Sequence, residues 1–466
     1  LVGSEMCIRD SGCFRKVPFV DRSGSAVFFS WICARSQNAD ILIVCSFAIG
    51  FLKGFLMLWF IRYAQKIFSP NNVRSEFYSY FYPLVYGGGQ VSMLVTAQLA
   101  YYYDWKYMYY FMMLLMLVAI LLVIICFRHN RPIKSVPIAD LHIREMFIIS
   151  AGLLMLMYVI NYGKVLDWMS SAKICAYIVI APMLIALFIW IQIHSDKPYV
   201  SLAPLYQPKA IIGYLYMMIV MFFSTSTTLL TNYLSVILKV DTTHTYSLYI
   251  YLLPGYLAGA FICFWWFRWQ RWRFRFLIAG GMGCFVIFFA ILYFGISPGS
   301  TYEMLYLPIF FRGLGMLTLI IAFALFAVED LNPKYLLSNA FFLIIFRSVL
   351  TPIMATSFYS NVLYRLEQKY MCSLSETITT ADPLAASKYS QSLNTALSQG
   401  HRYDEAVQIA TNSLHATLQQ QSLLLALKEI LGYLLVISVI IAVVSRFIPF
   451  HKTIRVTFLR TGDDMV

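Results

Sequence analysis

The chain has 466 residues, of which 60% are hydrophobic and only 12% are charged, against roughly 45–50% apolar and 25% charged residues in soluble domains. This composition excludes a soluble globular protein, because an apolar run without a polar face has no side for water to solvate. Lys and Arg outnumber Asp and Glu by 35 to 22, for a formal charge of +13. The basic residues lie in short loops between apolar runs, so they indicate membrane topology rather than a nucleic-acid partner.

Residues 1–12 (LVGSEMCIRDSG) lack a signal-peptide pattern and resemble a translated cloning scar, so we exclude them from the fold. Twelve apolar runs follow, and we expect them to form helices that cross a hydrocarbon core about 30 Å thick. The first run has the weakest apolar pattern, because it carries Asp21 and Arg22. The expected spans are residues 17–34, 41–61, 78–102, 107–127, 146–160, 174–193, 210–238, 246–267, 276–297, 304–328, 335–363 and 423–445.

The fifth and sixth runs are joined by a short connection, which predicts a helical hairpin over residues 144–193. Four runs precede this hairpin and six follow it, whereas a transporter built from two matched halves has equal numbers on both sides. We therefore expect an incomplete N-terminal bundle at 13–127, an inserted helix pair at 144–193, and a C-terminal bundle formed by 210–363 and 423–445. The polar stretch 364–422 has helix-compatible spacing in two parts and predicts a partly helical loop outside the membrane.

The distribution of basic residues predicts the orientation of these spans. When successive loops are assigned alternately to the two sides of the membrane, one side has 20 Lys and Arg, and the short loops of the other side have 5. Loops rich in Lys and Arg stay in the cytoplasm. We therefore expect the tail 446–466 in the cytoplasm and the loop 364–422 outside it.

Three basic residues lie well inside expected spans: Lys53, Arg312 and Arg347. An ionisable group in the bilayer core costs about 2.5–3.5 kcal/mol on insertion scales and usually faces a cavity or a partner. Arg312 and Arg347 are candidates for polar locks between helices or for a substrate or gating role, and both alternatives stay open. Lys53 lies near the cytoplasmic end of its span, where its side chain can also snorkel to the interface.

The span 210–238 is the most polar of the long ones, with eight consecutive or closely spaced hydroxyl and amide residues between 224 and 233. Hydroxyls beside aromatic faces suit a cavity for amphipathic molecules, although Ser and Thr also pack helices and bond their own backbone. We expect Thr228, Asn232 and Tyr233 to line a substrate cavity.

The span 78–102 combines glycines with amides. Gly87, Gly88 and Gly89 predict conformational flexibility. At least one of Gln90 and Gln98 is expected to face the protein interior, because lipid would not tolerate their amides, and both are candidates for the same substrate cavity. A phosphate-binding role for these glycines is excluded by the absence of GxxxxGK[ST] and by their place inside a span.

The sequence contains no sign of enzymatic chemistry. Nine Cys are scattered without CxxC or Cys/His ligand spacing, and we interpret them as small core residues, not metal ligands. HExxH, GxSxG and paired carboxylates are lacking, so we expect neither an enzyme nor a cofactor. No long span carries Asp, Glu or His at its middle, although proton-coupled carriers normally need such a group.

Several segments resemble one known family. Residues 163–168 (GKVLDW), followed by an apolar helix and residues 196–205 (DKPYVSLAPL), are similar to the inserted helix pair and following loop of the fourteen-span drug:proton antiporters of the major facilitator superfamily. The resemblance covers about residues 14–449. Elements similar to the family also occur at 104–107 (DWKY), at 332–334 (NPK) ahead of Ser338, Asn339 and Arg347, and at 419–424 (QQQSLL).

The resemblance implies that the chain begins in the loop between the family's second and third spans. Phe14, Arg15 and Lys16 would then be a remnant of that loop's basic motif. The first two spans and the family's acidic first-span motif would be missing. The family's fifth-span antiporter motif is represented only by small residues, Ser92 and then Thr96 and Ala97.

The implied fold is all-α, with two helical bundles, an extra central helix pair and a site near the bilayer midplane. The implied function is multidrug efflux: outward transport of amphipathic organic compounds or drugs across the bacterial plasma (inner) membrane, by alternating access coupled to the proton gradient. In Gram-negative bacteria such carriers often work with a periplasmic adaptor protein. A carrier that imports a nutrient or siderophore, or a membrane scaffold without transport activity, are the alternatives.

Overall fold

The computed structural model describes residues 16–68, 74–126, 142–195, 198–269, 273–329, 331–332, 335–377, 382–448 and 450. The expected scar at 1–12, Phe14 and Arg15 of the basic motif, and most of the expected cytoplasmic tail lie outside these residues.

The described chain is helical and contains no strand, which confirms the predicted all-α class. Apolar blocks of about 20 residues form these helices because every backbone N–H and C=O then bonds within its own segment. The α-helices are α2 (Lys16–Arg35), α3 (Ala39–Phe68), α4 (Arg74–Tyr102), α5 (Lys106–Cys126), α6 (Ile143–Tyr162), α7 (Ala172–His194), α8 (Pro208–Ser224), α9 (Thr227–Asn232), α10 (Thr242–Leu248), α11 (Leu252–Trp269), α12 (Phe274–Gly295), α13 (Tyr306–Phe326), α14 (Leu336–Ile344), α15 (Thr351–Thr377), α16 (Pro383–Ser398) and α17 (Tyr403–Val444).

Within the described residues, nine helical segments are long and apolar enough to cross a membrane. They correspond to the last nine of the twelve expected spans. Helices α2, α3 and α4 occupy the other three expected ranges, so each apolar run of the sequence is a helix in the structure.

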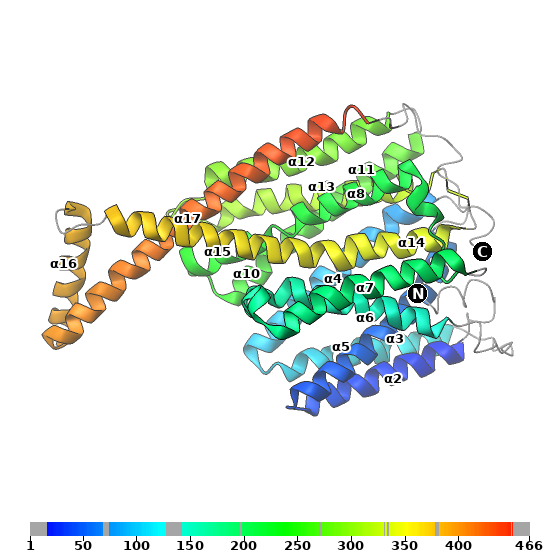
Figure 1. The fold of residues 1–466 in the computed structure, drawn as a ribbon, viewed down its shortest axis with the longest axis horizontal. Coiled ribbons are helices and arrows are strands. Elements are labelled where there is room, and N and C mark those ends of the chain that lie inside the picture. The colour runs from blue at the N-terminus through cyan, green and yellow to red at the C-terminus, as the bar shows by residue number, and fades with distance from the viewer. Residues whose placement is uncertain are drawn as a thin grey trace.

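The helices gather in two groups (Figure 1). Helix α2 packs against α3 and α5, and α4 packs against both α3 and α5. In the second group α13 is central: it packs against α8, α11 and α12, while α17 packs against α12 and α15. Helix α4 also packs extensively against α11 and α13, so it joins the two groups.

Two glycines allow α11 and α13 to touch along their backbones. A Cβ on Gly255 would collide with the carbonyl oxygen of Phe310 and lie 2.9 Å from the backbone nitrogen of Leu314. A Cβ on Gly313 would lie 2.9 Å from the carbonyl oxygen of Leu252. Small residues at such crossings let membrane helices approach closely, where dispersion forces hold them together.

The predicted hairpin is formed by α6 and α7, which pack against each other. Gln192 Nε2 of α7 donates to Glu145 Oε2 of α6 at 2.8 Å and ties the two helices of the hairpin together. The Ser357 hydroxyl of α15 donates to the carbonyl oxygen of Ile160 at 2.6 Å and attaches the hairpin to the C-terminal helices. The hairpin is therefore a fixed part of the second group.

Three of the expected spans are not continuous α-helices, and one of them, the run 246–267, contains the 3₁₀ turn Tyr249–Tyr251. The run 210–238 breaks after Ser224 and continues as α9 and then as a π-helix over Tyr233–Ile237. The run 335–363 contains a second π-helix at Ile345–Leu350, which carries Arg347. Hydrophobic pattern alone does not reveal such breaks, because they preserve the apolar character of the segment.

The expected loop 364–422 is almost entirely helical where the structure describes it. Helix α15 extends to Thr377, and α17 is continuous from Tyr403, so the second part of the loop and the last expected span form one helix. Helix α16 packs against α17, and the pair projects beyond the helical bundle (Figure 1).

Candidate functional site

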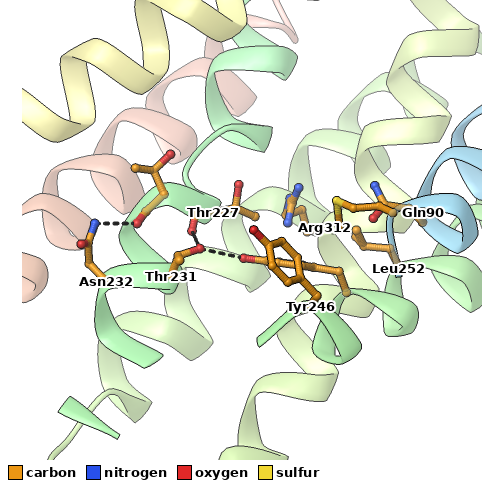
Figure 2. Close-up of a pocket in the computed structure, with 10 residues that line it drawn as sticks. Gln90, Thr227, Thr231, Asn232, Tyr246, Leu252 and Arg312 are labelled. Atoms are coloured by element: carbon orange, nitrogen blue, oxygen red, sulfur yellow. Dashed lines mark hydrogen bonds between the residues drawn. The ribbon is translucent and has the colours of Figure 1, made fainter. Parts of the chain in front are cut away.

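A cavity of about 430 Å³ lies between α4 and the C-terminal group of helices. Its volume is in the range of small-molecule sites, roughly 300–1,000 Å³. Helices α4, α9, α10, α11 and α13 and the 3₁₀ turn Tyr249–Tyr251 contribute side chains (Figure 2). The lining residues are Gln90, Met93, Thr227, Thr228, Thr231, Asn232, Tyr246, Tyr249, Leu252 and Arg312.

Helix α9, which begins just after the break at the end of α8, forms one wall of the cavity. Thr228 Oγ1 donates to the carbonyl oxygen of Thr225 at 3.2 Å, Thr231 Oγ1 to that of Thr227 at 3.0 Å, and Asn232 Nδ2 to that of Thr228 at 2.9 Å. These hydroxyls use their hydrogen on the backbone, so the lone pairs of their oxygens remain as acceptors. The α9 wall therefore presents mainly hydrogen-bond acceptors.

Arg312 of α13 supplies the only formal charge of this lining. Its side chain is 93% buried, since its relative exposure is 7%. Nη2 is 3.4 Å from the Ser224 hydroxyl, which is beyond the usual 2.7–3.2 Å range for an N–H···O bond. Nε and Nη1 have no hydrogen-bond partner among the described residues.

Gln90 of α4 lines the same cavity as Arg312 (Figure 2). Its Oε1 atom is buried and has no hydrogen-bond partner within the described part of the chain. Tyr249 adds a hydroxyl that shares a hydrogen bond of 3.2 Å with Thr231 Oγ1. The cavity thus combines aromatic surface, hydroxyl and amide groups with one buried cation.

A second polar cluster joins α4 to the π-helix that carries Arg347, at residues that do not line the cavity. Arg347 Nη1 is 3.4 Å from the Tyr82 hydroxyl, and its guanidinium carbon lies 5.6 Å from the centroid of the Tyr82 ring. Tyr82 stacks with Tyr86, and Tyr86 contacts Tyr256 at 6.0 Å between ring centroids. These tyrosines connect Arg347, through two side chains of α4, with α11.

The structure brings together four of the residues that the sequence singled out. Thr228, Asn232, Gln90 and Arg312 all line the cavity. Gly87 is buried, and a Cβ there would lie 3.3 Å from Leu253 of α11, whereas Gly88 and Gly89 face open space.

The remaining candidates lie elsewhere. Tyr233 is fully buried, and its hydroxyl donates to the carbonyl oxygen of Ser297 at 2.8 Å. Gln98 and Lys53 are exposed, and neither they nor Arg347 are among the cavity residues.

Six cavity residues were not among the predicted site residues: Met93, Thr227, Thr231, Tyr246, Tyr249 and Leu252. Tyr246 and Tyr249 are three residues apart at the start of an apolar span, a spacing that places them on one face of a helix. Aromatic residues at a span end are also typical of the membrane interface, so this signal does not distinguish the two roles.

No group of three or more His, Cys, Asp or Glu side chains able to hold a metal ion occurs among the described residues. The lining of the cavity contains neither a carboxylate nor an imidazole. The hydroxyl groups of the lining therefore have no carboxylate or imidazole base among the other lining residues.

Comparison with known families matches residues 23–356 to the family model described as Major Facilitator Superfamily. The chain belongs to the Major Facilitator Superfamily. Membership agrees with the two groups of helices and with a cavity between them, which is where such transporters place their substrate site. Superfamily members are secondary transporters of small molecules across membranes, so this chain is a multi-pass membrane transport protein. A search of curated proteins found no match.

Proposed function

We propose that this protein exports amphipathic organic compounds across the plasma membrane by alternating access coupled to the proton gradient. The cavity carries the proposal: one wall belongs to α4 of the N-terminal group, and the others belong to the C-terminal group. A site divided between two groups of helices is exposed to one side or the other when the groups rock against each other. Its aromatic rings and hydroxyls suit a molecule with apolar and polar parts.

Outward direction and proton coupling are supported by the resemblance to the fourteen-span drug:proton antiporters. The cavity lining supplies no titratable carboxylate or His, so a proton would be carried by a group outside this set. A periplasmic adaptor protein is a further proposed partner, and α16 with the outer part of α17 projects where such a protein would meet the transporter (Figure 1).

The proposal is tested in inverted membrane vesicles from cells that produce the protein. An amphipathic fluorescent dye should accumulate inside energised vesicles, and a protonophore should abolish the accumulation. A Thr228→Val, Asn232→Leu variant, which replaces two polar side chains of the α9 wall with apolar ones, should lower the initial rate at least about tenfold, as expected when buried polar contacts to a ligand are lost. Accumulation only in right-side-out cells would instead identify an importer, and no movement in either orientation would leave a protein without transport activity.

A further inference from the structure

The buried guanidinium of Arg312 has hydrogen-bonding capacity that the described residues do not use. An Arg side chain has five N–H donors, and the structure pairs it with a single long contact at 3.4 Å to Ser224. Nε and Nη1 are buried without a partner. A buried charge that is neither paired nor hydrogen-bonded is strongly unfavourable, so this arrangement indicates that an anion belongs beside Arg312.

The described surroundings of Arg312 do not provide that anion. None of the side chains that line the cavity is acidic. Two carboxylates flank α13 in the chain: Glu303, which precedes it, is exposed, and Glu329, which follows it, is engaged with Lys209 at 3.3 Å. Since Arg312 also lines the cavity, a molecule bound there can reach the guanidinium directly (Figure 2).

The other polar groups of the cavity fix the orientation of such a molecule. The threonine oxygens of α9 act as acceptors, because their hydrogens bond backbone carbonyls, and Gln90 Oε1 is a further unpaired acceptor. Acceptors repel an acidic group, so they direct it toward Arg312 and leave space for hydroxyl or N–H groups of the same molecule on their own side.

We propose that the cavity selects organic anions, and that a carboxylate, sulfonate or phosphate of the transported molecule binds Arg312. Cations of similar size are disfavoured, because no acidic side chain of the lining offsets the positive charge of Arg312. This inference names the substrate class of the proposed transporter and therefore rests on the proposed function.

Binding to the detergent-purified protein tests the inference without any gradient. Three fluorescent probes of one shape are compared by their anisotropy: 6-hydroxy-2-naphthoate, its methyl ester and (6-hydroxynaphthalen-2-yl)methylammonium. The acid should bind at least about tenfold more tightly than the ester, as expected for a hydrogen bond to a charged group, and the ammonium compound should bind most weakly. Equal affinity for the acid and the ester, including no measurable binding of either, would overturn the inference.

Variants locate the effect at Arg312. Arg312→Gln should abolish the preference for the acid, and Arg312→Lys should retain part of it, because Lys keeps the charge without the planar set of donors. The matched control is Arg268→Gln. Arg268 is exposed and lies at the end of α11 opposite to the cavity residue Leu252, so its substitution should leave the preference unchanged. A preference for the acid that survives in Arg312→Gln would contradict the assignment. If Arg312→Gln does not fold, the affinities of the three probes for the unmodified protein still test whether the cavity prefers an anion.

The binding and vesicle experiments fail independently. Binding of the acid through Arg312 without movement of any compound would support the anion site and contradict the proposed transport function. Transport of only neutral and cationic dyes, at the same rate in Arg312→Gln as in the unmodified protein, would support the transport function and contradict the anion site.

Discussion

At the scale of single residues, the two arginines inside the C-terminal spans differ in their surroundings: Arg312 is buried and Arg347 is half-buried. Arg347 has an aromatic partner on another helix, since its guanidinium lies against the Tyr82 ring. Arg312 has a cavity beside it and only one long contact to protein. Sequence analysis left both residues with the same two alternatives, a helix lock or a substrate role. We propose the first for Arg347 and the second for Arg312.

The contact between Arg347 and Tyr82 predicts a graded set of effects on stability. Arg347→Ala should lower the free energy of unfolding by about 1–2 kcal/mol, because it removes a partly desolvated cation–π contact. Tyr82→Phe should cost less than about 0.5 kcal/mol, since it keeps the ring and removes only a hydrogen bond of 3.4 Å. Thermal unfolding of the purified variants measures both changes.

A double-mutant cycle separates this contact from other consequences of the substitutions. The combined variant Arg347→Ala, Tyr82→Ala should lose clearly less stability than the sum of the two single variants. Strict additivity would mean that Arg347 and Tyr82 do not stabilise each other.

Individual side-chain positions could be predicted from the sequence only in part. Thr228 and Asn232 were found because hydroxyl and amide groups are conspicuous in an apolar span. Gln98 was expected beside Gln90, but eight residues place it about 12 Å further along the same helix, which accounts for its absence from the cavity lining. Tyr233 follows Asn232 by about 100° around the helix axis, and this rotation directs it into the bundle, where it bonds Ser297.

At the scale of helices, the sequence predicted the elements and not their mutual rotation. Uninterrupted apolar blocks leave little choice of structure in a bilayer, so the expected spans and the hairpin of α6 and α7 are all present as helices. The break between α8 and α9 depends on Ser and Thr side chains that bond backbone carbonyls. Such bonds are equally compatible with a continuous helix, so the break could not be predicted.

The crossing of α11 and α13 predicts which glycines tolerate a methyl group. Gly255→Ala should destabilise the protein by roughly 1–3 kcal/mol, because the new Cβ would meet backbone atoms of α13 that cannot move aside. Gly280→Ala on α12 is the matched control, since nothing lies within 4 Å of its Cβ position. It should be neutral or stabilising by up to about 1 kcal/mol through helix propensity.

Unfolding temperatures of the two Ala variants in the same detergent provide the comparison. A lower midpoint for Gly255→Ala alone is the expected result. Equal midpoints would show that α11 and α13 are further apart than the structure places them.

At the scale of the whole molecule, the charge distribution predicts the orientation in the membrane. Cys372 is exposed near the outer end of α15, on the side that the excess of Lys and Arg assigns to the exterior. A variant with Cys372 as its only cysteine should react with a membrane-impermeant maleimide in intact cells. Labelling only in permeabilised cells would show that the orientation is opposite to the predicted one.

The control for this labelling is Arg268→Cys in a background without other cysteines. Arg268 is exposed at the opposite end of the bundle, so this variant should be labelled only after permeabilisation. The two variants together report both sides of the membrane in one experiment.

Helix α17 gives the transporter a long rigid arm. It has 42 residues, or about 63 Å at 1.5 Å per residue, roughly twice the thickness of a hydrocarbon core of about 30 Å. Its inner half packs on α12 and α15, and its outer half carries α16. A rigid-body rotation on the order of 15° would swing the tip of an arm about 30 Å long by about 8 Å. The same rotation would therefore displace the outer helix pair further than it displaces the inner half of α17.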